Sequence, residues 1–231
     1  MRSGFCYNGN KLNNLLISTP TADQANSGYW VQSSEFDSME YCIGFRFRLT
    51  SILEKSQTII QSIDTSAGTV CFSFYIAEDF LKFTNKENSF KVFAVDDDTW
   101  YYFYAYVGEE SMTVYLYNMT TNATLSDTFV LNAHYPANSK IFFLNNFNGD
   151  DAIHGTMCDF MFESGGADLF EIYKSGGYRF GQYQIHCPMR EGSGSTCRFL
   201  GRTDLVLQAG GTVVAPTWAV FEGTDVGRRW V

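Results

Sequence analysis

Oxygen-bearing side chains crowd one short stretch of the chain, where they could hold a hard cation. The stretch contains Asn146, Asn148, Asp150 and Asp151, and Asp64 can reach it from another turn. Calcium binds to several carboxylate and carbonyl oxygens at once. The sequence therefore indicates a candidate Ca²⁺ site formed by these five residues. The alternative is a solvated turn in which the Asn-Gly pair adopts a positive φ.

A row of aromatic side chains is the second candidate site. Period-two alternation over 100–107 places every second residue on one face, and the following segment can extend the row. The row consists of Trp100, Tyr102, Tyr104, Tyr106, Tyr115 and Tyr117. A tyrosine ring can stack on a sugar or on a partner chain, and its hydroxyl can form hydrogen bonds. We therefore expect a glycan site or a protein contact here, or else a row that loops or the glycine-rich tail cover.

Other reactive side chains form no pattern that is typical of a known chemistry. His134, His154 and His186 are widely separated and lack the paired spacing of zinc ligands. The sequence also lacks a phosphate-binding loop, a dinucleotide fingerprint and the local motif of a nucleophilic triad. The six cysteines include no Cys-x-x-Cys pair. Because the sequence shows no export signal, we expect reduced thiols that mostly fill the core.

Alternation of apolar and polar residues predicts the elements that position these side chains. In Ile43–Leu49, for example, Ile43, Phe45 and Phe47 alternate with Gly44 and Arg46. Short strands separated by polar turns predict an all-β, antiparallel jelly-roll sandwich. The expected strands are Ile43–Leu49, Gln57–Ile63, Val70–Ile76, Phe80–Thr84, Ser89–Val95, Trp100–Val107, Met112–Tyr117, Asp127–Leu131, Lys140–Asn145, Gly155–Glu163 and Asp168–Tyr173, with shorter ones at Asp204–Gln208, Gly211–Val214 and Trp218–Phe221.

Composition excludes several classes of protein. Aromatic residues make up 17% of the 231 residues, far more than a disordered chain carries. The net charge of −9 argues against a nucleic-acid binder, which would present a basic face. The sequence contains no apolar stretch long enough to span a membrane. Its N-terminal residues do not resemble a secretory signal peptide.

The order of these segments resembles the concanavalin A-like lectin/glucanase sandwich of the laminin-G-like type. The resemblance runs from about Gly28 to Tyr173. An aspartate-containing turn precedes the Trp-led strand Trp100-Tyr101-Tyr102-Phe103, and Val114-Tyr115-Leu116-Tyr117 follows. The segment His154–Phe160 is similar to the closing strand of the family. The resemblance implies that Phe103, Ala105 and Val107 point into the core, which leaves the tyrosines on the other face.

Glucanases of this fold use paired carboxylates on one strand, and the nearest match here is incomplete. Asp159 and Glu163 alternate onto one face, but Met157 stands where the leading glutamate would be. Four strand residues span about 13 Å, which exceeds the carboxyl separation of either glycosidase class. We therefore expect no enzymatic activity and a structural role for Asp159.

The C-terminal part carries a second resemblance. Met189–Ser195 is similar to a segment found beside such sandwiches in bacteriophage virion proteins and bacterial surface proteins. We divide the chain into an N-terminal arm or first strand (1–27), a lectin-like sandwich (28–173) and a glycine-rich, β-rich C-terminal extension (174–231). The resemblance implies a virion structural protein of the capsid, neck or tail. Its expected partners are other virion proteins, further copies of itself and surface polysaccharide; the alternative is a carbohydrate-binding or glycan-cleaving surface protein.

Overall fold

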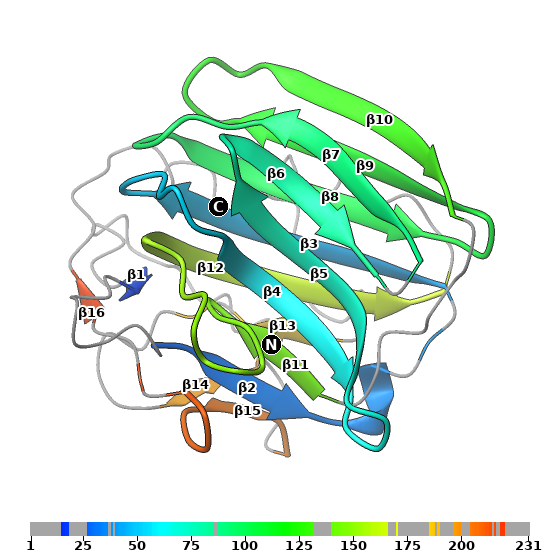
Figure 1. Ribbon diagram of the computed structural model, residues 1–231, viewed down its shortest axis with the longest axis vertical. Coiled ribbons are helices and arrows are strands. Elements are labelled where there is room, and N and C mark those ends of the chain that lie inside the picture. Colours follow the sequence, from blue (N-terminus) through cyan, green and yellow to red (C-terminus); the bar gives the residue numbers. More distant parts are fainter. Residues whose placement is uncertain are drawn as a thin grey trace, which may run out of the picture.

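The computed structural model describes two facing β-sheets and one short 3₁₀-helix, η1 (Ser34–Phe36) (Figure 1). The described residues are 15–18, 27–36, 38, 40–85, 87–131, 140–165, 170, 185–187, 189, 196–199, 204–213, 215 and 218–219. Within these ranges, no helix is long and apolar enough to cross a lipid bilayer.

The first sheet has β3 at its centre and carries the tyrosine row. Its spatial order is β10 (Thr124–Val130), β9 (Ser111–Asn118), β8 (Trp100–Val107), β3 (Tyr41–Leu49), β12 (Gly155–Ser164), β1 (Leu15–Ser18) and β16 (Trp218–Ala219), and β13 (Ile185–Cys187) also pairs with β12. All of these pairs are antiparallel.

The second sheet faces the viewer in Figure 1, where β4, β5, β6 and β7 lie in front of β3, β8 and β12. Its order is β14 (Thr196–Arg198), β15 (Val206–Gln208), β2 (Tyr29–Gln32), β11 (Lys140–Phe143), β4 (Gln57–Asp64), β5 (Thr69–Ala77), β6 (Phe80–Thr84) and β7 (Ser89–Ala94). These ladders are antiparallel as well.

The prediction of an all-β antiparallel sandwich is confirmed. The expected bounds of Phe80–Thr84 and Trp100–Val107 agree with β6 and β8, whereas β10 begins three residues before the expected Asp127. The predicted arm and extension add strands to the two sheets. β1 and β13 pair with β12, and β15 pairs with β2. Of the expected strand at 168–173, only Phe170 lies within the described residues.

Phenylalanines from both sheets fill the space between them. Phe45 on β3 and Phe103 on β8 belong to the first sheet, and Phe74 on β5 belongs to the second. The ring centroid of Phe74 lies 4.7 Å from that of Phe103, which lies 5.0 Å from that of Phe45. All three side chains are completely buried. Aromatic pairs at such separations add stabilisation beyond their buried area, so these rings hold the sheets together.

We predict that Phe74→Ala lowers the free energy of unfolding by about 3–5 kcal/mol, because it leaves a cavity between the sheets. Leu125→Ala on β10 is the matched control, since Leu125 is 50% exposed and its truncation should change stability by less than about 0.5 kcal/mol. Urea unfolding followed by tryptophan fluorescence measures both values. Equal losses in the two variants would contradict this account of the core.

Candidate functional site

The tyrosine row lies on the outward face of the first sheet and is largely covered. Tyr102 and Tyr104 are only 1% and 0% exposed, and they form a second apolar cluster with Cys42 and Met161. Phe170 covers this cluster. Its ring stacks on Tyr115 with centroids 4.2 Å apart and lies 6.3 Å from Tyr102.

The other members of the row lie around this cluster. Tyr106 and Tyr115 are half-buried against it, and the buried Tyr117 donates its hydroxyl proton to Asn122 at 2.6 Å. Trp100 packs instead with the main core. The predicted division of β8 is right for Phe103, Ala105 and Val107, which point into the main core. Of the alternatives for the row, the structure favours coverage by the chain itself.

Asp159 is a structural carboxylate. It is 1% exposed, and its carboxylate oxygens lie 3.6 Å from Arg46 Nε and 3.7 Å from His186 Nε2. A β-bulge between Cys158 and Met161 gives Asp159 a φ of 52°. This burial and these contacts fit the structural role expected for Asp159.

The predicted calcium loop, residues 145–151, is closed by Asn146. Its Nδ2 donates to Asp150 Oδ1 at 2.7 Å and to Asp151 Oδ2 at 3.0 Å. Its Oδ1 accepts from the backbone N–H groups of Gly149 and Asp150. These backbone donors fix the amide orientation, so an N–H donor and not an oxygen ligand stands where the two carboxylates converge.

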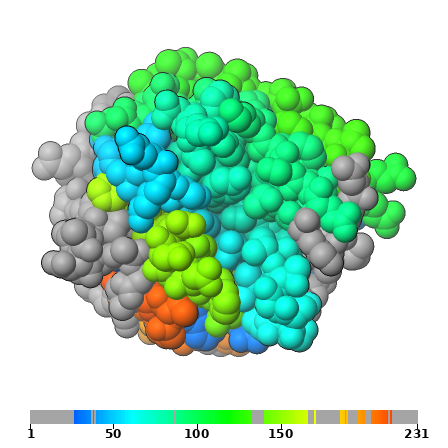
Figure 2. All heavy atoms as spheres, in the orientation of Figure 1, coloured from blue at the N-terminus to red at the C-terminus, as the bar shows by residue number. Residues whose placement is uncertain are grey.

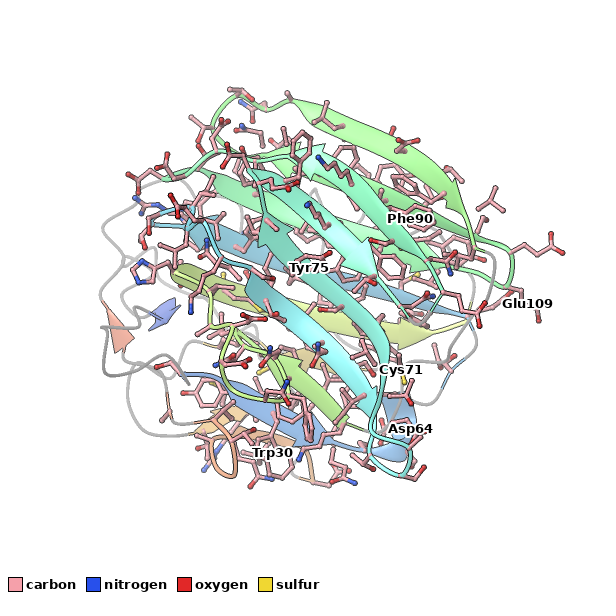
Figure 3. All side chains as sticks on the ribbon, viewed as in Figure 1. Trp30, Asp64, Cys71, Tyr75, Phe90 and Glu109 are labelled. Carbon is pink, nitrogen blue, oxygen red and sulfur yellow. The ribbon has the colours of Figure 1, made fainter. Side chains whose placement is uncertain are left out.

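The structure does not bring the other predicted calcium ligands to that point. Asp64 accepts hydrogen bonds from the backbone and hydroxyl of Ser66 and from the N–H of Ala67, within the turn between β4 and β5 (Figure 3). These bonds hold the pKa of Asp64 below its ordinary value. Asn148 is exposed, and the described residues include no group of three His, Cys, Asp or Glu side chains that could hold a metal. As arranged, these residues do not fit a calcium cage.

A different polar site lies on the outward face of the second sheet. The space-filling view shows this face, where atoms of the 145–151 loop stand beside those of β4 and β5 and the surface is hollowed (Figure 2). The hollow, here called the outer groove, has a volume of about 300 Å³. It is lined by Ser56, Thr58, Gln61, Val70, Ser73, Tyr75, Thr84, Asn85 and Asp151.

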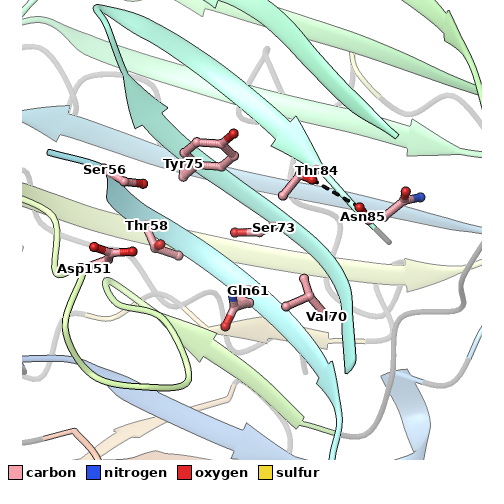
Figure 4. Close-up of a pocket in the computed structure, with 9 residues that line it drawn as sticks. All are labelled: Ser56, Thr58, Gln61, Val70, Ser73, Tyr75, Thr84, Asn85 and Asp151. Carbon is pink, nitrogen blue, oxygen red and sulfur yellow. Dashed lines mark hydrogen bonds between the residues drawn. The ribbon is translucent and has the colours of Figure 1, made fainter. Parts of the chain in front are cut away.

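Strand register brings these side chains together. Gln61 on β4 pairs with Ser73 on β5, which pairs with Thr84 on β6, so the three form a row across the sheet. In the neighbouring row Thr58 pairs with Tyr75. Figure 4 shows Asp151 at one end of the outer groove and Asn85 at the opposite end, with Ser73 between them.

Several polar groups of the outer groove can form further hydrogen bonds with a ligand. Gln61 uses its Oε1 to accept from the N–H of Phe147 at 2.9 Å, and its Nε2 makes no bond to another described residue. The hydroxyls of Thr58, Ser73 and Tyr75 likewise form no hydrogen bond within the described part of the chain, although Thr58 and Ser73 are each only 3% exposed. Polar groups held in this way require water or a ligand.

Asp151 supplies the charge of the outer groove. Its Oδ2 accepts from Asn146, and its backbone carbonyl accepts from the N–H of Thr58 at 2.7 Å, which fixes the loop against β4. Burial and the neighbouring Asp150 carboxylate raise the pKa of Asp151, while Lys55 and Asn146 act in the opposite direction. Lys55 Nζ lies 3.3 Å from the carbonyl oxygen of Asp150.

Sequence reasoning found Asp151 but missed the rest of the outer groove. The alternation in β5 already indicates that Ser73 and Tyr75 point away from Phe72 and Phe74. The same alternation predicts Val70 on the core side with those phenylalanines. A register shift between Ser62 and Ile63 instead turns Val70 outward, where it lines the groove. Such a shift leaves no signal in the hydrophobic pattern.

We predict that Asn146→Asp lowers the free energy of unfolding by about 2 kcal/mol or more, because it replaces a donor to two carboxylates with a third carboxylate. Asn148→Asp makes the same chemical change at an exposed position and should have little effect. The wild-type melting temperature should be the same in calcium and in EDTA. A calcium-dependent rise of several degrees in the wild type would contradict the proposed closure by Asn146.

Comparisons with known proteins define the fold. No family profile and no curated protein sequence matches the chain. Among solved structures, a protein from Bacteroides ovatus to which carbohydrate binding has been attributed superposes with a TM-score of 0.63 and 9% identity, over 92% of this chain. This chain spans 61% of that protein's length.

Two further solved structures superpose on this chain. A heptameric SAP-like pentraxin from Limulus polyphemus has a TM-score of 0.53 and 12% identity, over 87% of this chain and 98% of its own. The extracellular region of zebrafish Gpr126/Adgrg6 has a TM-score of 0.57 and 12% identity, over 88% of this chain and 27% of its own. Identities this low establish the fold alone, and this chain has the concanavalin A-like jelly-roll fold.

Proposed function

We propose that this protein binds carbohydrate in the outer groove. The observation that carries the proposal is the set of unpartnered hydroxyl and amide groups around the half-buried Tyr75, on an otherwise regular sheet face. A sugar offers hydroxyls that both donate and accept, together with an apolar ring face. The outer groove supplies the complement, because Gln61 donates, Asp151 accepts and Tyr75 provides a ring.

The shape of the outer groove supports a saccharide unit rather than a compact ligand. It is shallow and open, and it is lined by short hydroxyl side chains between strands β4, β5 and β6. Val70 and Tyr75 are its apolar contributors. The few apolar and many polar groups favour a hydroxylated ligand over a hydrophobic one.

We propose that this binding is non-enzymatic. Glycoside hydrolysis needs two carboxyl groups on opposite sides of the scissile bond. Among the described residues that line the outer groove, Asp151 is the one carboxylate. Asp150 and Asp151 both accept from the same Asn146 nitrogen, so their carboxylates converge on that amide rather than flank the groove.

We further propose that the sandwich is part of a phage virion, as a capsid, neck or tail appendage that attaches to surface polysaccharide. The resemblance of Met189–Ser195 to segments of virion proteins supports this assignment. The alternative is a bacterial surface protein with the same binding activity.

Tyr75→Ala should weaken binding to the best glycan of an oligosaccharide array by about tenfold or more, which corresponds to roughly 1.4 kcal/mol. The loss follows from removal of the stacking ring. Titration calorimetry with that glycan gives the dissociation constants, and a reducing-sugar assay on the same glycan tests for hydrolysis.

Tyr106→Ala is the control for this experiment. It removes a half-buried tyrosine from the outward face of the other sheet. Weaker binding in Tyr106→Ala with unchanged binding in Tyr75→Ala would place the glycan on the tyrosine row and reject the outer groove. Release of reducing ends by the wild type would reject the non-enzymatic assignment.

The virion assignment predicts that an antibody against this chain labels phage particles in negative-stain images. Particles of the phage that encodes the chain are the sample, and particles of an unrelated phage are the control. Unlabelled particles, with the antibody shown to recognise the purified protein, would reject the assignment while leaving carbohydrate binding intact.

A further inference from the structure

The charge of the outer groove restricts what it can bind. Of the described residues that line it, Asp151 alone is charged at neutral pH, and no lysine or arginine is among them. The Asp150 carboxylate shares the Asn146 amide with Asp151, so a second negative charge lies close to the first. An anionic group placed beside Asp151 would be repelled by these carboxylates in a partly buried setting.

The lysines near this face form contacts of their own. Lys82 is the register neighbour of Tyr75, but its Nζ lies 2.8 Å from Glu78 Oε2, and Lys91 Nζ lies 3.3 Å from the same oxygen. These contacts lower the pKa of Glu78, which therefore stays ionised. On the other side, Lys55 donates to the backbone carbonyl of Asp150, and its charge acts on the Asp151 carboxylate.

Asp151 is well placed to accept hydrogen bonds from uncharged hydroxyls. A carboxylate is an acceptor with about four lone-pair sites, and the described contacts use one bond from Asn146. The hydroxyls of Ser56 and Thr58 and the Nε2 of Gln61 line the same part of the groove (Figure 4). Neighbouring sugar hydroxyls could therefore donate to Asp151 while they accept from these groups.

We propose that the outer groove selects neutral glycans and excludes those that carry carboxylate or sulfate groups on the bound unit. This inference rests on the proposed carbohydrate binding and names its ligand class. The net charge of −9 acts in the same direction, because it repels polyanions before they make contact.

The test uses an array that holds neutral oligosaccharides together with uronic acid, sialylated and sulfated ones. Matched pairs, such as a glucose oligomer and its C6-oxidised glucuronic acid counterpart, isolate the charge. For each pair whose neutral member binds, we expect the affinity for the neutral glycan to exceed that for its acidic counterpart by about tenfold or more at low salt. Higher ionic strength should narrow the difference, because salt screens exposed charges.

Asp151→Asn tests whether the charge of Asp151 causes the discrimination against acidic glycans. The substituted amide keeps an oxygen that can accept from Asn146, so the loop should retain its fold. This variant should reduce the discrimination against acidic glycans severalfold. Asp150→Asn removes the same charge from a residue that does not line the outer groove, and it should change the discrimination less.

The outcomes separate this inference from the proposed function. Preferential binding of an acidic glycan, abolished by Tyr75→Ala, would overturn neutral selectivity and leave carbohydrate binding in place. Equal effects of Asp150→Asn and Asp151→Asn would overturn the contact role of Asp151. Absence of binding to every glycan would overturn the proposed function itself, and this inference with it.

Discussion

The packing of Phe74 against Phe103 across the two sheets is the contact on which the rest of the structure depends. Phe45 packs against both rings, with its centroid 5.0 Å from that of Phe103 and 6.4 Å from that of Phe74, so one aromatic cluster joins β3, β8 and β5. Strands have a period of two, and a strand that gives one face to this cluster must give its other face to the outside. The fold therefore offers functional groups two outward faces, one on each sheet.

These two outward faces differ in how far the chain itself covers them. On the first sheet, Phe170 covers Tyr102 and Tyr104, and the Arg46–Asp159 pair is buried nearby. A buried ion pair needs its partners in place, since loss of either one leaves an uncompensated charge. Much of this face is therefore buried in contacts within the chain. The face of the second sheet that carries Tyr75 keeps hydroxyls that form no hydrogen bond within the described residues, and we place the proposed binding there.

The sequence predicted the strands between Tyr41 and Ser164 because burial on one side of a sheet imposes a visible alternation, whereas the predicted strand Gly211–Val214 contains a turn at 211–212. Alternation separated the two faces of β8, but the family resemblance supplied which face is buried, and Trp100 packs with the main core instead of with the tyrosines. The sequence could not predict that Phe170 covers the tyrosines, since that contact joins residues far apart in the sequence, such as Phe170 and Tyr115. Nor could it predict the outward turn of Val70, because a register shift leaves composition and alternation unchanged.

The oxygen-rich loop shows why side-chain type alone did not identify its role. Asn146 satisfies Asp150, Asp151 and two backbone N–H groups at once, and Thr212 donates its hydroxyl proton to the carbonyl of Phe147. Gly149 has a φ of 77°, and a Cβ there would collide with the carbonyl oxygen of Thr212, so only glycine allows this close approach. Hydrogen bonds thus fix Asp151 at the edge of the outer groove before any ligand arrives. A preorganised acceptor costs little entropy when a ligand binds, which favours the carbohydrate binding that we propose for the outer groove.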